Sequence, residues 1–137
     1  RTIHGRDVFA PVAAHLSRGV AIRRLGSVCE NLRRLPWPRL VRQKNSIRGE
    51  VVYLDRFGNA ISNIPVASIV ETGYGQGVAV VKTRVVPLKG CYADVRIGKP
   101  VAVPGSSGLL EVSINGGSAA RDLRVGIGDP IVIKCAP

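Results

Sequence analysis

From residue 48 onward the chain consists of short runs rich in valine and isoleucine, separated by glycine and proline. Six runs are predicted as strands: Arg48–Leu54, Ala60–Ile64, Val78–Thr83, Pro100–Val103, Leu109–Ile114 and Pro130–Lys134. Short strands with turn signals between them are typical of a small barrel or sandwich. We therefore predict a mainly β domain over residues 48–137, with one helical turn at 118–123.

The first residues follow a helical pattern instead. Apolar side chains recur at spacings of three and four, at Phe9, Val12, Ala13 and Leu16. This spacing predicts a short helix, with Asp7 as its N-cap and Gly19 as its stop. One helix without a preceding strand cannot bury its apolar face alone. We therefore expect residues 1–19 to be the end of a domain that this chain lacks, an expectation that fits the absence of methionine.

Residues 20–47 are predicted as a basic linker, since Leu35-Pro36-Trp37-Pro38 opposes regular structure. The net charge of the chain is +11, and this segment carries much of it. Such a charge raises nucleic acid as a partner, but the segment has few interleaved aromatic rings on which bases could stack. Nucleic acid is therefore not the partner we expect, and binding to it stays a third hypothesis.

The bulk composition indicates a folded protein of the cytoplasm. Hydrophobic residues make up 45% of the chain, no apolar run approaches the roughly 20 residues of a membrane span, and no signal peptide is visible. Three widely spaced cysteines without a Cys-x-x-Cys pair are typical of a reducing compartment and predict no metal site.

A polar block at residues 55–63 interrupts the apolar pattern. A plain turn needs only asparagine and glycine, whereas this block adds a carboxylate, a guanidinium and an aromatic ring. Phe57 could stack on a nucleobase, Asn59 could hydrogen-bond to it, and Asp55 could pair with an ammonium group. The alternative is a polar turn with an Asp55–Arg56 surface pair, and the pattern alone leaves both interpretations open.

Two further places could carry chemistry. His4 precedes the predicted helix, whose N-terminus favours anions, although a surface or capping histidine is the alternative. The loop 104–108 offers backbone N–H groups and the hydroxyls of Ser106 and Ser107 to a carboxylate or phosphate. Asn115-Gly116 is typical of a hairpin turn, and two ordinary turns around a strand are the alternative for this region.

Taken in order, three blocks of the sequence resemble one family. The blocks are His4 through Leu16, Asp55-Arg56-Phe57-Gly58-Asn59 with Asn63-Ile64, and Ser106 through Glu111 with Asn115 through Ala119. They are similar to the S-adenosylmethionine hydroxide adenosyltransferases, whose superfamily also contains fluorinating and chlorinating adenosyl enzymes. The similarity covers nearly the whole chain, and the first two motifs are long and specific.

The resemblance implies an architecture and an activity. Family members have an N-terminal α/β domain and a C-terminal β-barrel, and they form trimers that bind S-adenosylmethionine between neighbouring subunits. Water or hydroxide attacks the ribose C5′ atom and gives adenosine and methionine, with no cofactor beyond the substrate. Residues 1–19 would end the α/β domain, 20–47 would be the linker and 48–137 the barrel. This chain alone is then expected to be inactive.

The resemblance also implies roles for particular residues. His4 matches the catalytic histidine of the hydrolytic members, and the halogenating relatives have a different residue there. The implied substrate-binding residues are Asp55 and Ser106 for the methionine ammonium and carboxylate, Phe57 and Tyr92 around the adenine, and Asn59, Asn115 and Gly116 at its polar edge. Ser107 stands where the fluorinating branch has an arginine. A halogenating enzyme and a non-catalytic module for an adenosyl ligand or a protein are the alternatives.

Overall fold

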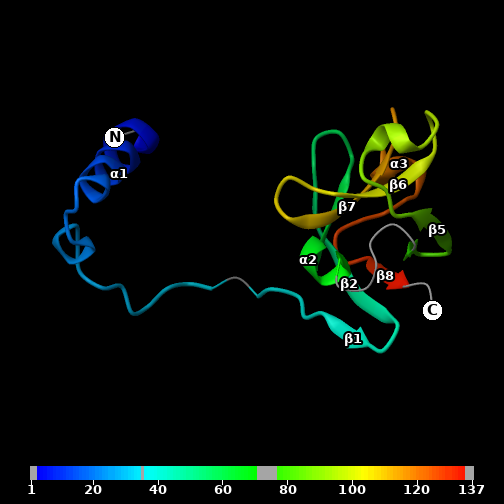
Figure 1. Cartoon of the computed structure of the whole chain (residues 1–137), viewed down its shortest axis with the longest axis horizontal. Coiled ribbons are helices and arrows are strands. Elements are labelled where there is room, and N and C mark those ends of the chain that lie inside the picture. The colour runs from blue at the N-terminus through cyan, green and yellow to red at the C-terminus, as the bar shows by residue number, and fades with distance from the viewer. Residues whose placement is uncertain (1–2, 35, 71–76, 135–137) are drawn as a thin grey trace. The chain divides into compact units, whose positions relative to one another are not determined.

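The computed structural model describes residues 3–34, 36–70 and 77–134, and the chain divides into two compact units, Arg1–Leu35 and Pro36–Pro137 (Figure 1). In the first unit a π-helical turn, η1 (Gly5–Phe9), runs directly into the helix α1 (Ala10–Ser17). A 3-10 turn, η2 (Ile22–Arg24), follows. None of the residues in these three elements is buried.

The predicted helix is confirmed, but its start is not where the sequence suggested. The helical turn begins at Gly5, so Asp7 lies inside it and His4 takes the N-cap position without a side-chain cap bond. Asp7 instead pairs with Arg6, with Nε and Oδ1 2.7 Å apart. The end is as predicted, because Gly19 adopts a φ of +80°, which a residue without Cβ adopts readily.

The second unit is a nearly closed antiparallel barrel of eight strands. They are β1 (Val41–Gln43), β2 (Ser46–Leu54), β3 (Ala60–Pro65), β4 (Val78–Val81), β5 (Arg84–Pro87), β6 (Pro100–Pro104), β7 (Leu109–Ile114) and β8 (Pro130–Lys134). Their order in the sheet is β5-β4-β8-β2-β3-β7-β6, with β1 paired to β2. A bridge between Leu88 and Ala102 joins the two ends of this order.

Alternation along the strands builds the core. In β8, for example, Ile131 and Ile133 point inward and are fully buried, whereas Pro130 and Lys134 are exposed. Side chains from β2, β3, β4, β7 and β8 meet them in one hydrophobic cluster. The short helices α2 (Val66–Val70) and α3 (Ala119–Asp122) and the 3-10 turn η3 (Tyr92–Asp94) connect the strands. The mainly β prediction is therefore confirmed, as is the helical turn near Ser118.

All six predicted strands exist, but β1, β5 and α2 were not predicted. The sequence predicts one strand over Val78–Thr83, whereas the chain turns back after Val81 and returns as β5. Lys82 makes this turn with a φ of +54°, a conformation that glycine or asparagine usually signals. Its Nζ atom lies 3.0 Å from Oδ2 of Asp129 and also donates to the carbonyl of Arg124.

The region predicted as linker, 20–47, contains η2, β1 and the start of β2, and residues from Pro36 onward belong to the barrel unit. Asn63, which is buried, fastens this segment. Its Nδ2 atom donates to the Pro38 carbonyl over 2.8 Å, and its Oδ1 accepts from the Glu50 N–H over 2.8 Å. Gly49 permits this contact, since a Cβ there would lie 2.2 Å from Oδ1 of Asn63.

Among the described helices, none has the length and apolar character that a membrane crossing requires.

Candidate functional site

Asp55 organises the loop between β2 and β3. Its Oδ1 accepts hydrogen bonds from the N–H groups of Phe57 (2.8 Å) and Asn59 (2.9 Å), and its Oδ2 accepts from the side-chain amide of Asn59 (2.9 Å). The loop closes through the N–H of Gly58, which donates to the Asp55 carbonyl over 3.0 Å. Asp55 is thus rigidly oriented at the end of β2.

The same contacts set the ionisation of Asp55. Partial burial raises the pKa of this carboxyl, but the hydrogen bonds from Asn59, Phe57 and Gly58 favour the charged form and outweigh it. The net pKa lies below the usual range of an aspartate. Asp55 is therefore an anion at neutral pH and a suitable partner for a cation.

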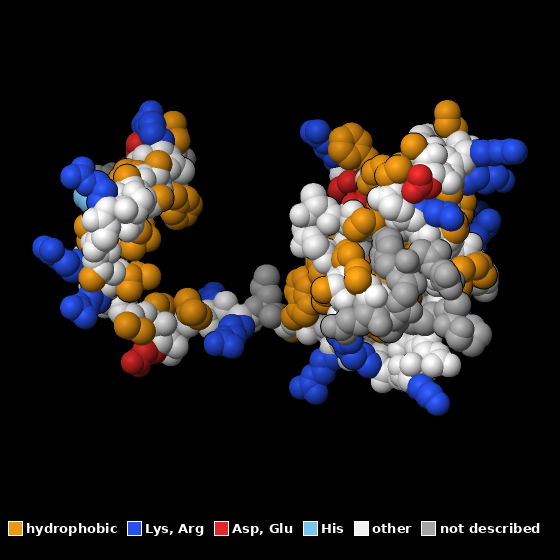
Figure 2. Space-filling view, viewed as in Figure 1, with side chains coloured by type: hydrophobic (Ala, Val, Ile, Leu, Met, Phe, Trp, Pro, Cys, Tyr) orange, Lys and Arg blue, Asp and Glu red, His pale blue; other side chains and the backbone are white. Residues whose placement is uncertain are grey.

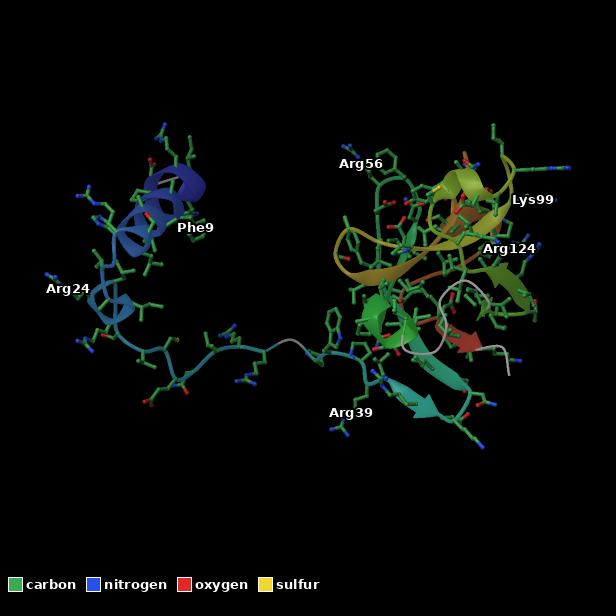
Figure 3. All side chains as sticks on the ribbon, viewed as in Figure 1. Phe9, Arg24, Arg39, Arg56, Lys99 and Arg124 are labelled. Atoms are coloured by element: carbon green, nitrogen blue, oxygen red, sulfur yellow. The ribbon has the colours of Figure 1, made fainter. Side chains whose placement is uncertain are left out.

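Phe57 projects from the tip of this loop and remains largely exposed. The guanidinium carbon of Arg56 lies 4.8 Å from the centre of its ring, a cation–π contact rather than the Asp55–Arg56 pair of the plain-turn alternative. Figure 3 shows Arg56 at the outer end of this loop. An exposed ring that keeps one face for a charged neighbour has its other face available for stacking.

Gly58 brings the second and third sequence blocks together. It adopts a φ of +86°, and a Cβ at this position would lie 2.0 Å from Oγ of Ser118. The N–H of Ala120 donates to the Gly58 carbonyl over 2.9 Å. Ser118 also caps α3 by accepting from the Arg121 N–H over 3.3 Å. The block at Asp55–Asn59 is therefore packed against the start of α3.

Beside this loop a pocket of about 420 Å³ opens on the barrel surface. Polar groups of three sequence regions line it: Asp55, Glu111, Ser106 and Ser107. Its apolar and aromatic walls are Trp37, Val52, Tyr53, Ile61 and Leu109. An apolar cavity with a few convergent polar groups is the usual form of a small-molecule site.

A register shift in β2 shapes the wall of the pocket. Val52 and Tyr53 are neighbours in sequence and would point to opposite faces of a regular strand. The pairing of β2 with β3 shifts between Val51 and Tyr53, as at a β-bulge, and both Val52 and Tyr53 line the pocket. Tyr53 is 58% exposed, so much of its ring stays available to a ligand.

The turn between β6 and β7 supplies the two serines. The N–H of Gly105 donates to the Leu109 carbonyl and that of Gly108 to the Gly105 carbonyl, over 2.9 and 3.0 Å. A Cβ at Gly105 would lie 2.9 Å from the Leu109 carbonyl oxygen, which explains the glycine. Ser106 and Ser107 are exposed at the tip of this turn, and no described residue hydrogen-bonds to their side chains.

Glu111 lies at the side of the pocket and is held by two hydroxyls. Tyr92 donates its phenolic O–H to Oε1 of Glu111, and Ser113 donates to the same oxygen over 2.9 Å. Burial, the hydrogen bond from Tyr92 to Glu111 and the negative charge of Glu111 together raise the pKa of Tyr92 to about 12. The negative charge of Asp55 adds to that rise.

Asn115 braces the neighbouring loop. Its Nδ2 donates to the Val95 carbonyl over 2.8 Å, and its backbone bonds to Lys99 and Gly98. Gly116 follows with a φ of +69°, and a Cβ there would approach the exposed side chain of Ile97 to 3.3 Å. Neither Asn115 nor Gly116 lines the pocket.

The pocket thus unites Asp55 with Ser106 and Ser107, whereas Phe57, Asn59, Tyr92, Asn115 and Gly116 do not line it. Asn59 and Tyr92 are linked to it through Asp55 and Glu111, and Gly58 joins the Phe57 loop to the chain after Gly116. His4 is exposed in the first unit.

The sequence interpretation did not assign six of the lining residues to the site, and three of these six are aromatic or charged: Trp37, Tyr53 and Glu111. Glu111 gave a usable signal, since an isolated carboxylate inside an apolar strand calls for a partner. Trp37 fell in the predicted linker, and the hydrogen bond from Asn63 to the neighbouring Pro38 carbonyl helps to hold the segment that carries it.

The described residues contain no group of three or more His, Cys, Asp or Glu that could hold a metal ion. On the face drawn in Figure 2, the Lys and Arg side chains of the barrel unit are spread around its edge and do not gather in one patch. The clearest concentration of ligand-binding groups is therefore the pocket at Asp55.

Residues 49–132 match the family model of the SAM hydroxide adenosyltransferase C-terminal domain. The chain belongs to this family. It is 43% identical over 135 residues to a protein of Thermus thermophilus named (R)-S-adenosyl-L-methionine hydrolase, a match that covers 95% of this chain and 48% of that protein. A protein of the same name from Salinispora tropica is 35% identical, with 93% and 49% covered. The chain spans about half the length of these curated relatives.

The chain is also similar in fold to solved structures. An uncharacterized conserved protein from Thermotoga maritima matches with a TM-score of 0.66 and 34% identity, covering 98% of this chain and 53% of that one. A conserved hypothetical protein from Thermus thermophilus matches with a TM-score of 0.60 and 42% identity, covering 95% and 52%.

Proposed function

We propose that the full-length protein hydrolyses S-adenosyl-L-methionine to adenosine and L-methionine, and that this chain supplies the barrel that binds the substrate. The observation that carries the proposal is the family match over residues 49–132, together with relatives named as hydrolases of this compound. The pocket supports it, since it places an oriented carboxylate beside two serine hydroxyls.

The proposed reaction is a displacement at the ribose C5′ atom. The oxygen of water or hydroxide forms a bond to C5′ while the C5′–S bond breaks. The electron pair of the broken bond stays on sulfur. Methionine leaves as a neutral thioether. When water is the nucleophile, its oxygen keeps one proton as the 5′ hydroxyl and releases the other to a base or to solvent. Because a sulfonium is already a good leaving group, the protein must mainly desolvate and aim the nucleophile.

Within this proposal the pocket holds the methionine part of the substrate. Asp55 binds its ammonium, and Ser106 with Ser107 binds its carboxylate. Two features support these roles: the pKa of Asp55 is held below its usual range, and both serines are exposed at the pocket. Ser107 offers a hydroxyl where the fluorinating relatives have an arginine, so the carboxylate is bound here without a cation from this position.

The adenine is proposed to lie over the rim, between Phe57 and Tyr92. The polar edge of the base meets Asn59, Asn115 and the backbone at Gly116. The Nδ2 atom of each asparagine donates one hydrogen bond within the protein, so each side chain still offers its carbonyl oxygen and its second N–H to the base. His4, in the first unit, is the proposed catalytic residue that positions the attacking water.

The family resemblance also supports a homotrimer with each site between neighbouring subunits, and this assembly is part of the proposal. The proposed compartment is the cytoplasm, where thiols remain reduced, as suits the free and exposed Cys29 and Cys91.

The test is incubation of the purified full-length protein with S-adenosylmethionine, followed by chromatography for adenosine and methionine. Equal amounts of the two products are expected without added halide, and none from this chain alone. Products that require chloride or fluoride, with no adenosine, would assign the protein to the halogenating branch and contradict the proposal.

A further inference from the structure

The pocket contains a second carboxylate to which the family resemblance assigns no role. Glu111 is half-buried in β7 and lines the pocket with Asp55, and the residues that line this pocket include no lysine or arginine. Two carboxylates on one small cavity attract a cation more strongly than a single one does. The composition of the lining therefore favours a positively charged ligand.

The two oxygens of Glu111 differ in their surroundings. Oε1 accepts from both Tyr92 and Ser113, which fixes the plane of the carboxylate. Oε2 has no hydrogen-bond partner among the described residues. It lies 3.4 Å from where a Cβ of Gly105 would be, in the turn between β6 and β7. One oxygen is thus anchored, and the other is left on the side of Ser106 and Ser107.

Asp55 keeps acceptor capacity for the ammonium proposed above, although it already accepts three hydrogen bonds. Its Oδ1 already takes two N–H groups of the loop, and its Oδ2 takes the amide of Asn59. A ligand with two positive centres can therefore use one carboxylate for each. S-adenosylmethionine has two such centres, the ammonium and the sulfonium.

Resting on the function proposed above, we propose that Glu111 recognises the positive charge of the sulfonium and so selects adenosyl sulfonium ligands over neutral thioethers. Oε2 is the recognising atom, and Tyr92 and Ser113 hold it in place. A methyl sulfonium has no hydrogen-bond donor, so the Glu111 carboxylate attracts it by charge alone. An oriented anion near the sulfonium is therefore sufficient for recognition. The thioether S-adenosylhomocysteine shares the adenosine and amino-acid groups and lacks only this charge and its methyl group.

Calorimetric binding to the full-length protein tests this role without turnover. The probes are S-adenosylhomocysteine and sinefungin, in which a carbon bearing an ammonium replaces the methyl sulfonium, so that no thioether can leave. The wild-type protein is expected to bind sinefungin more tightly than S-adenosylhomocysteine. Glu111→Gln should reduce this preference about five- to tenfold, which is the effect of removing one charge from a partly solvated site. The variant should bind sinefungin more weakly and S-adenosylhomocysteine as before.

Two variants separate charge recognition from a structural role. Glu50→Gln makes the same charge change on β2, outside the pocket, and should leave the preference unchanged. Tyr92→Phe removes the hydroxyl that orients Glu111 but keeps its charge, so the preference should fall by less than about twofold.

The inference is overturned if Glu111→Gln weakens both ligands equally, or neither, or if Tyr92→Phe reproduces its effect. Failure of the proposed function looks different. In that case the wild-type protein releases no adenosine from S-adenosylmethionine, whatever the ligand preference of the Glu111 variant.

Discussion

The α-carbon of Gly58 lies so close to Ser118 that a β-carbon there would stand 2.0 Å from the serine Oγ. This contact joins the loop after β2 to the start of α3, two regions that are far apart in the sequence. Gly58 also has a φ of +86°, so two independent features require glycine at this position.

Gly58→Ala should therefore destabilise the protein by about 3 kcal/mol or more, from backbone strain together with overpacking. Gly98→Ala is the matched control, because Gly98 has a φ of +80° but open space where a Cβ would stand. It should cost only about 1 kcal/mol. Urea denaturation measures both, and equal losses would show that the Ser118 contact does not matter.

Asn63→Ala should free the segment that carries Trp37. The substitution removes the hydrogen bonds to the Pro38 carbonyl and the Glu50 N–H, and it leaves the Glu50 N–H without its partner. We expect a loss of about 2–3 kcal/mol in unfolding free energy. The single tryptophan gives a second readout: Trp37 is already 62% exposed, so freeing its segment should lower the anisotropy of its fluorescence.

Asn45→Ala is the control for this change, because Asn45 is exposed in the turn between β1 and β2. It should alter neither stability nor fluorescence anisotropy. An Asn63 variant that keeps the wild-type fluorescence anisotropy would contradict the anchoring of Trp37 through Pro38.

Asp55 should make stability depend on pH on the acid side. Its pKa is lowered in the folded state, so its contribution is present above the pKa of the unfolded chain, about 4, and is lost as the pH falls through the folded value. Wild type should thus exceed Asp55→Asn in stability at neutral pH, and the difference should shrink below about pH 4. Denaturation series at several pH values check this, and a constant difference would contradict it.

Tyr92 should titrate on the alkaline side, with a pKa of about 12. Burial is the first cause and Glu111 the second, so Glu111→Gln should lower this pKa part of the way toward the usual value of about 10. Because the folded pKa is raised, the stability it contributes is present below about pH 10 and is lost as the pH rises through 12. Carbon-13 spectra of labelled tyrosine measure the titration, and an unchanged pKa in the variant would contradict the Glu111 contact.

The strand pattern was predictable wherever glycine or proline marked the turns. Leu109–Ile114 and Pro130–Lys134 have the predicted bounds. The prediction was wrong at Lys82, since its turn is stabilised by Asp129 and the Arg124 carbonyl rather than by a local signal. β1 was missed because its residues are all exposed and form a strand only by pairing with β2.

Part of the candidate site was also predictable from local sequence. Asp55, Ser106 and Ser107 belong to sequence motifs, and the fold brings them to one pocket. Trp37 joins them through an anchor formed by Asn63 on Pro38, 25 residues apart in the chain, and Glu111 is oriented by Tyr92, 19 residues away. No local pattern encodes such contacts, because they arise only when the strands have paired.

The most direct test of the central claim is hydrolysis of S-adenosylmethionine by the full-length protein in water enriched in oxygen-18. Attack of water at C5′ predicts adenosine with one oxygen-18 atom at its 5′ position and methionine with none. Adenosine without the label, or no adenosine at all, would contradict the account.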